Sequence, residues 1–111
     1  DAYGNGGFRF ADMSHRGSLL FLPSGVHGWD VTRIEDVTAG SFARVVEEAD
    51  AIEFVLFGTG RELRRPPPAV TAELRERGIR LEAMDTGAAA RTYNVLLGEE
   101  RRVAAALIAV E

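Results

Sequence analysis

Two short motifs contain the groups best suited to chemistry. Gly58-Thr59-Gly60 follows an apolar run, and Asp85-Thr86-Gly87 follows another and precedes a segment with helical spacing. Glycine-rich turns and the first turn of a helix expose backbone N–H groups, which attract anions. The two motifs therefore predict a site for a small carboxylate or phosphate, or for an acidic side chain of a partner. The arginines close enough in sequence to contribute are Arg61, Arg64, Arg65 and Arg91.

The second motif has an alternative interpretation. An apolar run followed by Asp-Thr-Gly-Ala is typical of retroviral-type aspartic proteases, in which each of two subunits supplies one aspartate. Those proteases are all-β, whereas residues 86–98 contain three consecutive alanines and large apolar residues at helical spacing. The pattern favours a helix that Asp85 or Thr86 caps, because their side-chain oxygens accept hydrogen bonds from the first turn.

Nucleophiles and metal ligands are scarce in this chain. It has no cysteine and only two histidines, His15 and His27, which fall in separate predicted turns. Without cysteine there is no disulfide, no thiolate nucleophile and no zinc–thiolate site. Two isolated histidines are too few for a metal site or a nucleophilic triad. The sequence therefore predicts no catalytic residues, no metal and no cofactor.

Length and charge restrict the class of protein. The 111 residues are 46% hydrophobic and 27% charged, which predicts one globular domain over residues 1–111. The net charge of −4 argues against general affinity for nucleic acid or anionic membranes. The longest apolar run, residues 103–110, is too short to span a bilayer. We expect a soluble, cytoplasmic protein, and Asp1 in place of methionine suggests that an N-terminal piece has been removed or left out.

Apolar runs and helical spacing predict the secondary structure. An antiparallel β section is expected at the N-terminus, with Trp29 in the core as the favoured interpretation and an interface anchor as the alternative. Further helices are expected at residues 42–49, 69–77 and 86–98, and further strands at 52–57, 79–84 and 102–110.

The order of these elements predicts an α/β fold around a largely parallel sheet. Strand–helix–strand units form right-handed crossovers between parallel strands. The strands at 52–57 and 79–84 should therefore be parallel, which places both glycine–threonine motifs at the same carboxyl edge. In open α/β sheets, ligands bind at that edge.

Four segments, in order, resemble one known family: YGNGGFRF at residues 3–10, GSLLFLPSGVHGW at 17–29, GTG at 58–60 and MDTGAAARTYNVLLGEERRVAAALI at 84–108. This widespread small α/β domain family has a poorly assigned function. It includes mitochondrial complex I (NADH:ubiquinone oxidoreductase) assembly factor 3 and an adipogenesis-associated domain protein. The resemblance covers nearly the whole chain, and Ala90 stands where a cysteine is common in the family.

The resemblance implies three layers around a mixed, mostly parallel sheet whose final strand is antiparallel to its neighbours. It also implies a non-enzymatic interaction module that assists biogenesis of a membrane respiratory complex, with subunits or assembly proteins as partners that hold it at the inner membrane. The alternative is a small-anion or small-molecule binder, or a weak enzyme, that uses the carboxyl-edge cleft. With Arg61 added for its charge, the predicted ligand or partner cleft comprises Gly58, Thr59, Gly60, Arg61, Asp85, Thr86, Arg91, Thr92, Tyr93 and Asn94.

Overall fold

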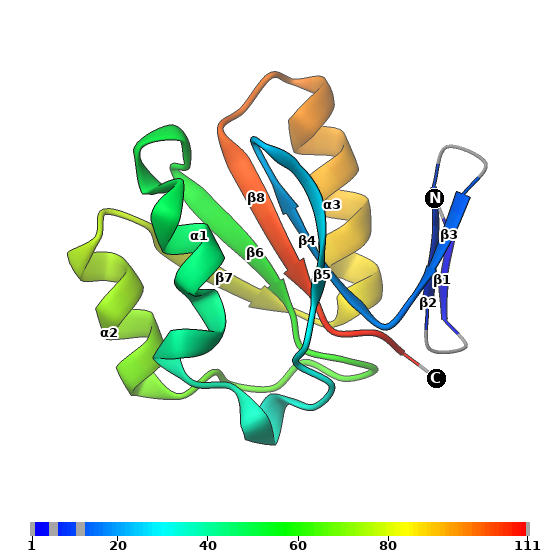
Figure 1. Cartoon of the computed structure of the whole chain (residues 1–111), viewed down its shortest axis with the longest axis horizontal. Helices are drawn as coiled ribbons and strands as arrows, with labels where there is room; N and C mark the ends of the chain where they lie inside the picture. Colours follow the sequence, from blue (N-terminus) through cyan, green and yellow to red (C-terminus); the bar gives the residue numbers. More distant parts are fainter. Residues whose placement is uncertain (1, 5–6, 11–12, 111) are drawn as a thin grey trace.

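The computed structural model describes residues 2–4, 7–10 and 13–110, with side chains from residue 17 onward. At the N-terminus three short strands form an antiparallel sheet: β1 (Ala2–Gly4), β2 (Gly7–Phe10) and β3 (Met13–Arg16). The main sheet has five strands in the order β5-β4-β8-β6-β7. Their bounds are β4 (Ser18–Leu22), β5 (Gly25–Trp29), β6 (Phe54–Gly58), β7 (Arg80–Met84) and β8 (Val103–Leu107). The predicted antiparallel β section at the N-terminus is thus confirmed, and Figure 1 shows both sheets.

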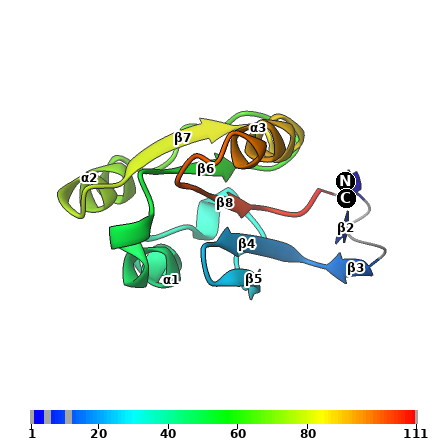
Figure 2. The same ribbon diagram turned by 90° about the horizontal axis from the view of Figure 1, so that it is seen from above.

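Three α-helices pack on the main sheet in the predicted three layers. α1 (Ala43–Glu47) and α2 (Pro68–Glu76) lie on one face, and α3 (Thr86–Gly98) lies on the other (Figure 2). The helix predicted at 42–49 is shorter than expected, because 3-10 turns η2 (Ala39–Phe42) and η3 (Ala49–Ala51) flank α1. A further 3-10 turn, η1 (Ile34–Asp36), precedes them. Among the described residues, no helix has both the length and the apolar character needed to cross a membrane.

The near-continuous apolar run of β6 follows from burial on both faces. Successive residues of a strand point to opposite sides. Val55 and Phe57 therefore pack in the cluster beneath α1 and α2, while Phe54 and Leu56 pack in the cluster beneath α3. A strand covered on both sides needs apolar residues at every position.

Trp29 belongs to the core, as the favoured interpretation predicted. Its side chain is 7% exposed, and its ring meets Phe42 and Phe57 edge-on with centroid distances of 5.4 and 6.0 Å. The indole N–H donates to the backbone oxygen of Ser41 over 2.8 Å. A buried tryptophan needs such a partner for its only donor.

The strand directions confirm the edge prediction and correct one detail. β6 and β7 are parallel, with Gly58 opposite Met84, so the two motifs do follow strand ends at one edge. The mixed sheet is confirmed, but β8 is antiparallel only to β4 and runs parallel to β6. The expectation that the final strand is antiparallel to its neighbours is confirmed for β4 and wrong for β6. The reason is that α3 returns the chain to the opposite end of the sheet before β8 begins, which forces a parallel strand.

Gly58 allows α3 to approach β6 closely. A Cβ atom at this position would lie 2.9 Å from both Cα and Oγ1 of Thr86 and 3.0 Å from Cδ2 of Leu107. Distances this short force neighbouring atoms to move. The first turn of α3 therefore rests on a position that tolerates no side chain.

We predict that Gly58→Ala lowers the free energy of unfolding by about 1–3 kcal/mol, because it overpacks the contact between α3 and the sheet. Gly98→Ala is the matched control, since a Cβ there meets nothing within 4 Å and lies in a helix. The control should stay within about 0.5 kcal/mol of the wild type, because Gly98 is the last residue of α3 and its added Cβ contacts nothing. Urea unfolding of both variants tests this, and an unchanged Gly58→Ala protein would contradict the packing argument.

Candidate functional site

The side chain of Thr86 ties three segments together at the carboxyl edge. It is fully buried, and its Oγ1 accepts from the N–H of Gly60 over 2.9 Å and donates to the oxygen of Ile108 over 2.7 Å. The N–H of Thr86 in turn donates to the oxygen of Gly60 over 2.8 Å. These bonds close the space between the ends of β6 and β7. The chain leaves β6 toward α2 on one face of the sheet and leaves β7 toward α3 on the other face. In an open α/β sheet, the ligand crevice lies where successive connections go to opposite faces.

Thr59 folds the loop after β6 around its own side chain. The residue is 4% exposed, and its hydroxyl donates to the oxygen of Glu62 over 2.7 Å and accepts from the N–H of Arg64 over 3.0 Å. Its backbone N–H donates to the oxygen of Met84 over 2.9 Å. Both threonines of the two motifs are therefore structural in this fold.

Asp85 caps α3, as predicted. One carboxylate oxygen accepts from the N–H of Ala88 over 2.9 Å. A helix starting at this aspartate, within a mixed α/β sheet, is incompatible with the all-β architecture of retroviral-type proteases. The Asp-Thr-Gly motif here marks the start of a helix.

Most backbone donors of the predicted anion site already have partners. The N–H groups of Gly60, Thr86 and Ala88 are bonded to acceptors within the chain. An anion at this edge would therefore depend mainly on arginine side chains, because the helix start and the glycine turn offer little free hydrogen-bonding capacity.

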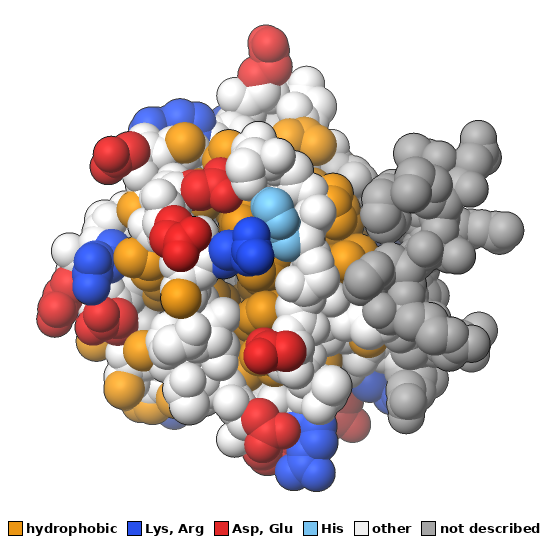
Figure 3. Space-filling view, in the orientation of Figure 1, with side chains coloured by type: hydrophobic (Ala, Val, Ile, Leu, Met, Phe, Trp, Pro, Cys, Tyr) orange, Lys and Arg blue, Asp and Glu red, His pale blue; other side chains and the backbone are white. Residues whose placement is uncertain are grey.

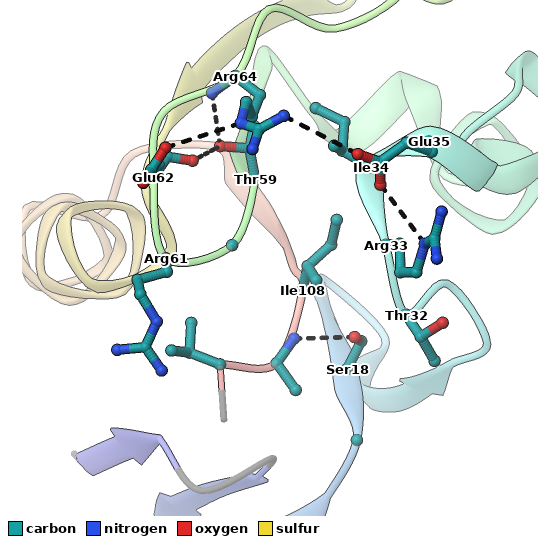
Figure 4. A pocket seen from close by; sticks show the side chains of 14 residues that line it. Ser18, Thr32, Arg33, Ile34, Glu35, Thr59, Arg61, Glu62, Arg64 and Ile108 are labelled. Carbon is teal, nitrogen blue, oxygen red and sulfur yellow. Dashed lines mark hydrogen bonds and ion pairs between the residues drawn. The ribbon is translucent and has the colours of Figure 1, made fainter.

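A pocket of about 700 Å³ lies next to this junction (Figure 4). It is formed by the loop after β6, the segment before η1 and the chain following β8, and Thr59, Gly60 and Arg61 of the predicted set line it. The charged side chains that line it are Arg33, Glu35, Arg61, Glu62 and Arg64.

Most of these charged side chains form weak ion pairs with one another. Glu35 lies 3.5 Å from Arg33 and 3.8 Å from Arg64, and Glu62 lies 3.9 Å from Arg64. All four side chains are more than half exposed, so each pair contributes well below about 1 kcal/mol. Arg61 forms no ion pair with any described residue and lies on the opposite side of the pocket from Arg33 (Figure 4).

The other predicted site residues do not join this pocket. Tyr93 and Asn94 line a second groove of about 580 Å³ at the opposite edge of the sheet, near the turn between β4 and β5. Arg91 is exposed and Thr92 is half-buried, and they line neither cavity. The predicted cleft is therefore not one site. Thr59, Gly60 and Arg61 line the pocket near the start of α3, and Tyr93 and Asn94 line the groove near its end.

A hydrogen-bonded group that the sequence did not reveal joins β5 to α1. Ser24 Oγ lies 2.6 Å from Glu48 Oε2 and 2.9 Å from Nε2 of His27, while Nδ1 of His27 lies 3.3 Å from Nη1 of Arg44. The imidazole is visible at the surface beside a basic side chain in Figure 3. Glu48 is 24 residues from Ser24, and no local spacing signals such a contact.

The partners of Ser24 differ from those of an activated serine nucleophile. A carboxylate only accepts, so Ser24 donates to Glu48, and Nε2 of His27 must donate to Ser24. Arg44 then donates to Nδ1. In this arrangement the imidazole cannot take a proton from the serine, which a nucleophilic triad requires. Among the described residues, no group of three or more acidic, histidine or cysteine residues could hold a metal ion.

The family described as a protein of unknown function (DUF498/DUF598) matches residues 1–108. The chain belongs to this family. An uncharacterized protein of Rhodobacter capsulatus is 40% identical over 97% of this chain and 82% of its own length.

Other relatives carry an assigned name. NADH dehydrogenase [ubiquinone] 1 alpha subcomplex assembly factor 3 is 37% identical in Mus musculus and 36% identical in Homo sapiens, over 97% of this chain. The match covers 58% of the mouse and 59% of the human protein, so this chain spans less than two thirds of their length.

Solved structures of relatives share the fold. A crystal structure from Bartonella henselae, described as an outer membrane protein, is 57% identical with a TM-score of 0.95, over all of this chain and 93% of that one. An NMR structure from Rhodopseudomonas palustris is 51% identical with a TM-score of 0.88, over all of this chain and 82% of that one.

We predict that Thr86→Val lowers the free energy of unfolding by at least about 2 kcal/mol. The valine keeps the shape but leaves the Gly60 N–H and the Ile108 oxygen without their partner, at about 1–3 kcal/mol per buried group. Thr86→Ser keeps the hydroxyl and should lose only about 1 kcal/mol for the missing methyl group. Chemical denaturation distinguishes them, and equal stability of the two variants would show that the hydroxyl is not the essential feature.

Tyr93 should make stability depend on pH in alkaline solution. It is 8% exposed and its ring packs against Phe21 at 5.2 Å, and burial raises the pKa of its hydroxyl above the usual value. The unfolded chain then loses this proton first, near pH 10. Stability should therefore fall as the pH rises above about 10. Tyr93→Phe should lose less stability between pH 8 and 11 than the wild type, and parallel curves would contradict this assignment.

Proposed function

We propose that this chain is a non-enzymatic interaction module that assists assembly of NADH:ubiquinone oxidoreductase. The observation that carries the proposal is its similarity, along 97% of its length, to proteins named as assembly factors of that enzyme. The proposal treats residues 1–111 as one domain that acts by binding protein partners.

The geometry of the carboxyl edge supports a binding role over catalysis. Thr59, Asp85 and Thr86 direct their side-chain oxygens to backbone groups of neighbouring segments. Away from that edge, Ser24 donates its hydroxyl proton to Glu48, so His27 is not placed to take it. General acid–base catalysis needs a side chain that can exchange a proton with a substrate. The motifs of this chain are instead used to join its loops and helices.

The partners that fit this proposal are subunits or other assembly proteins of the respiratory complex. We place the chain in the cytoplasm, where association with the inner membrane would occur through those partners.

Deleting the gene in the cell of origin tests the proposal. We expect less assembled NADH:ubiquinone oxidoreductase, more of its subassemblies, and restoration by the reintroduced gene, because the missing module no longer holds assembly partners together. Another respiratory enzyme of the same membranes serves as the control and should be unaffected. A normal amount of assembled enzyme in the deletion strain would overturn the proposal.

A second candidate function is binding of a small anion in the 700 Å³ pocket. The observation that favours it is Arg61, which lines the pocket and has no carboxylate partner among the described residues. One arginine contact with partial help from Arg33 and Arg64 supports millimolar affinity, about −4 kcal/mol.

Titration with phosphate, sulfate and small carboxylates tests this candidate. Backbone amide shifts should gather at residues 59–64 and vanish in Arg61→Ala, while Arg65→Ala should keep them. Shifts spread over the whole surface, or none at tens of millimolar, would exclude the pocket as an anion site.

A further inference from the structure

We infer that the second groove, of about 580 Å³, is a docking site for a partner polypeptide segment that carries apolar side chains and carboxylates. This groove lies at the edge of the sheet opposite the carboxyl edge. It is lined by residues of the β4–β5 turn, of the C-terminal half of α3 and of the start of β8. Leu22 and Pro23, at the C-terminal end of β4, line it. Figures 1 and 2 show β1–β3 beyond the N-terminal end of that strand. The inference deepens the proposed function, since it identifies the surface and the chemistry of the partner.

Exposed apolar side chains line the groove. The structure describes four exposed large apolar side chains, and two of them line this groove: Val26 of β5, 43% exposed, and Leu97 of α3, 51% exposed. The other two, Leu63 and Val95, line neither this groove nor the carboxyl-edge pocket. Exposed apolar side chains that line a groove lose water contact when a ligand enters it.

Contacts within the chain order the residues that form the groove. Two of its lining residues, Tyr93 and Phe21, pack against each other with ring centroids 5.2 Å apart. On the turn, Ser24 is bonded through both its N–H and its hydroxyl to the carboxylate of Glu48, beyond the groove. A preformed site loses little conformational freedom on binding, which favours affinity.

Charge indicates the polar part of the partner. The chain carries a net charge of −4, yet the groove is lined by two arginines and no acidic residue. Arg102 forms no ion pair with the described residues, and its Nη1 reaches only the backbone oxygen of Asp50 at 3.4 Å. Arg101 is partly neutralised by Glu53 at 3.8 Å. A guanidinium without a carboxylate partner favours a ligand that brings one.

The size of the apolar surface favours a polypeptide over a small acid. Val26 and Leu97 line the groove and are 43% and 51% exposed, so covering both of them requires a ligand with a large apolar surface. A polypeptide segment can cover both and still direct a carboxylate toward Arg102. Two arginines on an acidic chain are too few for nucleic acid, which requires a larger basic surface.

Selection from a library of random 14-residue displayed peptides tests the inference. The full chain is the target, and the variant Leu97→Gln/Arg102→Glu is the comparison. The matched control is Leu63→Gln/Arg65→Glu, which changes one exposed leucine and one exposed arginine outside both cavities. Thermal melts establish that each variant folds, and Arg102→Glu alone replaces the double variant if that one unfolds.

Enriched peptides should combine apolar residues with Asp or Glu. A synthetic copy should bind the wild type and the control variant equally, and the groove variant at least tenfold more weakly, with amide shifts at Val26, Leu97 and residues 101–103. No enrichment, basic consensus peptides, or equal binding to the groove variant would overturn the inference. Tighter binding of a fatty acid than of any peptide would identify the groove as a lipid site and overturn it as well.

Complementation of the deletion strain separates this inference from the proposed function. If the groove variant restores the respiratory enzyme as well as the wild type does, the docking site is wrong and the assembly role stands. If deletion leaves the enzyme unchanged while peptides still bind the groove, the assembly role is wrong and the docking site stands.

Discussion

The hydroxyl of Thr86 has two partners that are far away in sequence, Gly60 and Ile108, 26 residues before it and 22 residues after it. Through them it joins the start of α3 to the loop after β6 and to the chain leaving β8. The contact exists only because Gly58 has no side chain, so that the first turn of α3 can rest on the strand. The course of the loop that forms the carboxyl-edge pocket depends on this junction, and so does the position of α3 along the sheet.

The same helix connects two regions of different character. At its N-terminal end, polar groups are satisfied by the chain itself: Asp85 caps the helix, and Thr86 bridges its neighbours. At its C-terminal end, Leu97 is exposed and faces a groove lined by arginines. Polar groups that are paired within the chain stabilise the fold, whereas exposed apolar and cationic groups can contribute binding energy when a partner covers them. Contacts at the carboxyl edge therefore stabilise the fold, and the proposed docking site lies at the opposite edge.

Sequence motifs and chemical roles diverge in this domain. Asp-Thr-Gly suggests an aspartic protease when it is considered alone, and Gly-Thr-Gly suggests an anion-binding turn. In the structure the aspartate accepts from its own helix, and the N–H of Gly60 donates to a threonine hydroxyl. Motifs of small and hydroxyl-bearing residues serve close packing as readily as they serve ligands, because both uses need short side chains and accessible backbone groups.

The sequence by itself determined the features that arise within a few residues or from the order of elements. The apolar run at β6 predicted a strand buried on both faces, Asp85 predicted a helix start, and the strand–helix–strand order predicted the parallel pair β6 and β7. Only the tertiary structure decided that β8 lies between β4 and β6, that Gly60 meets Thr86, and that Glu48 reaches Ser24. Caps and periodicity are local properties of the chain. Strand order and distant side-chain contacts depend instead on how the helices pack on the sheet, which no local spacing encodes.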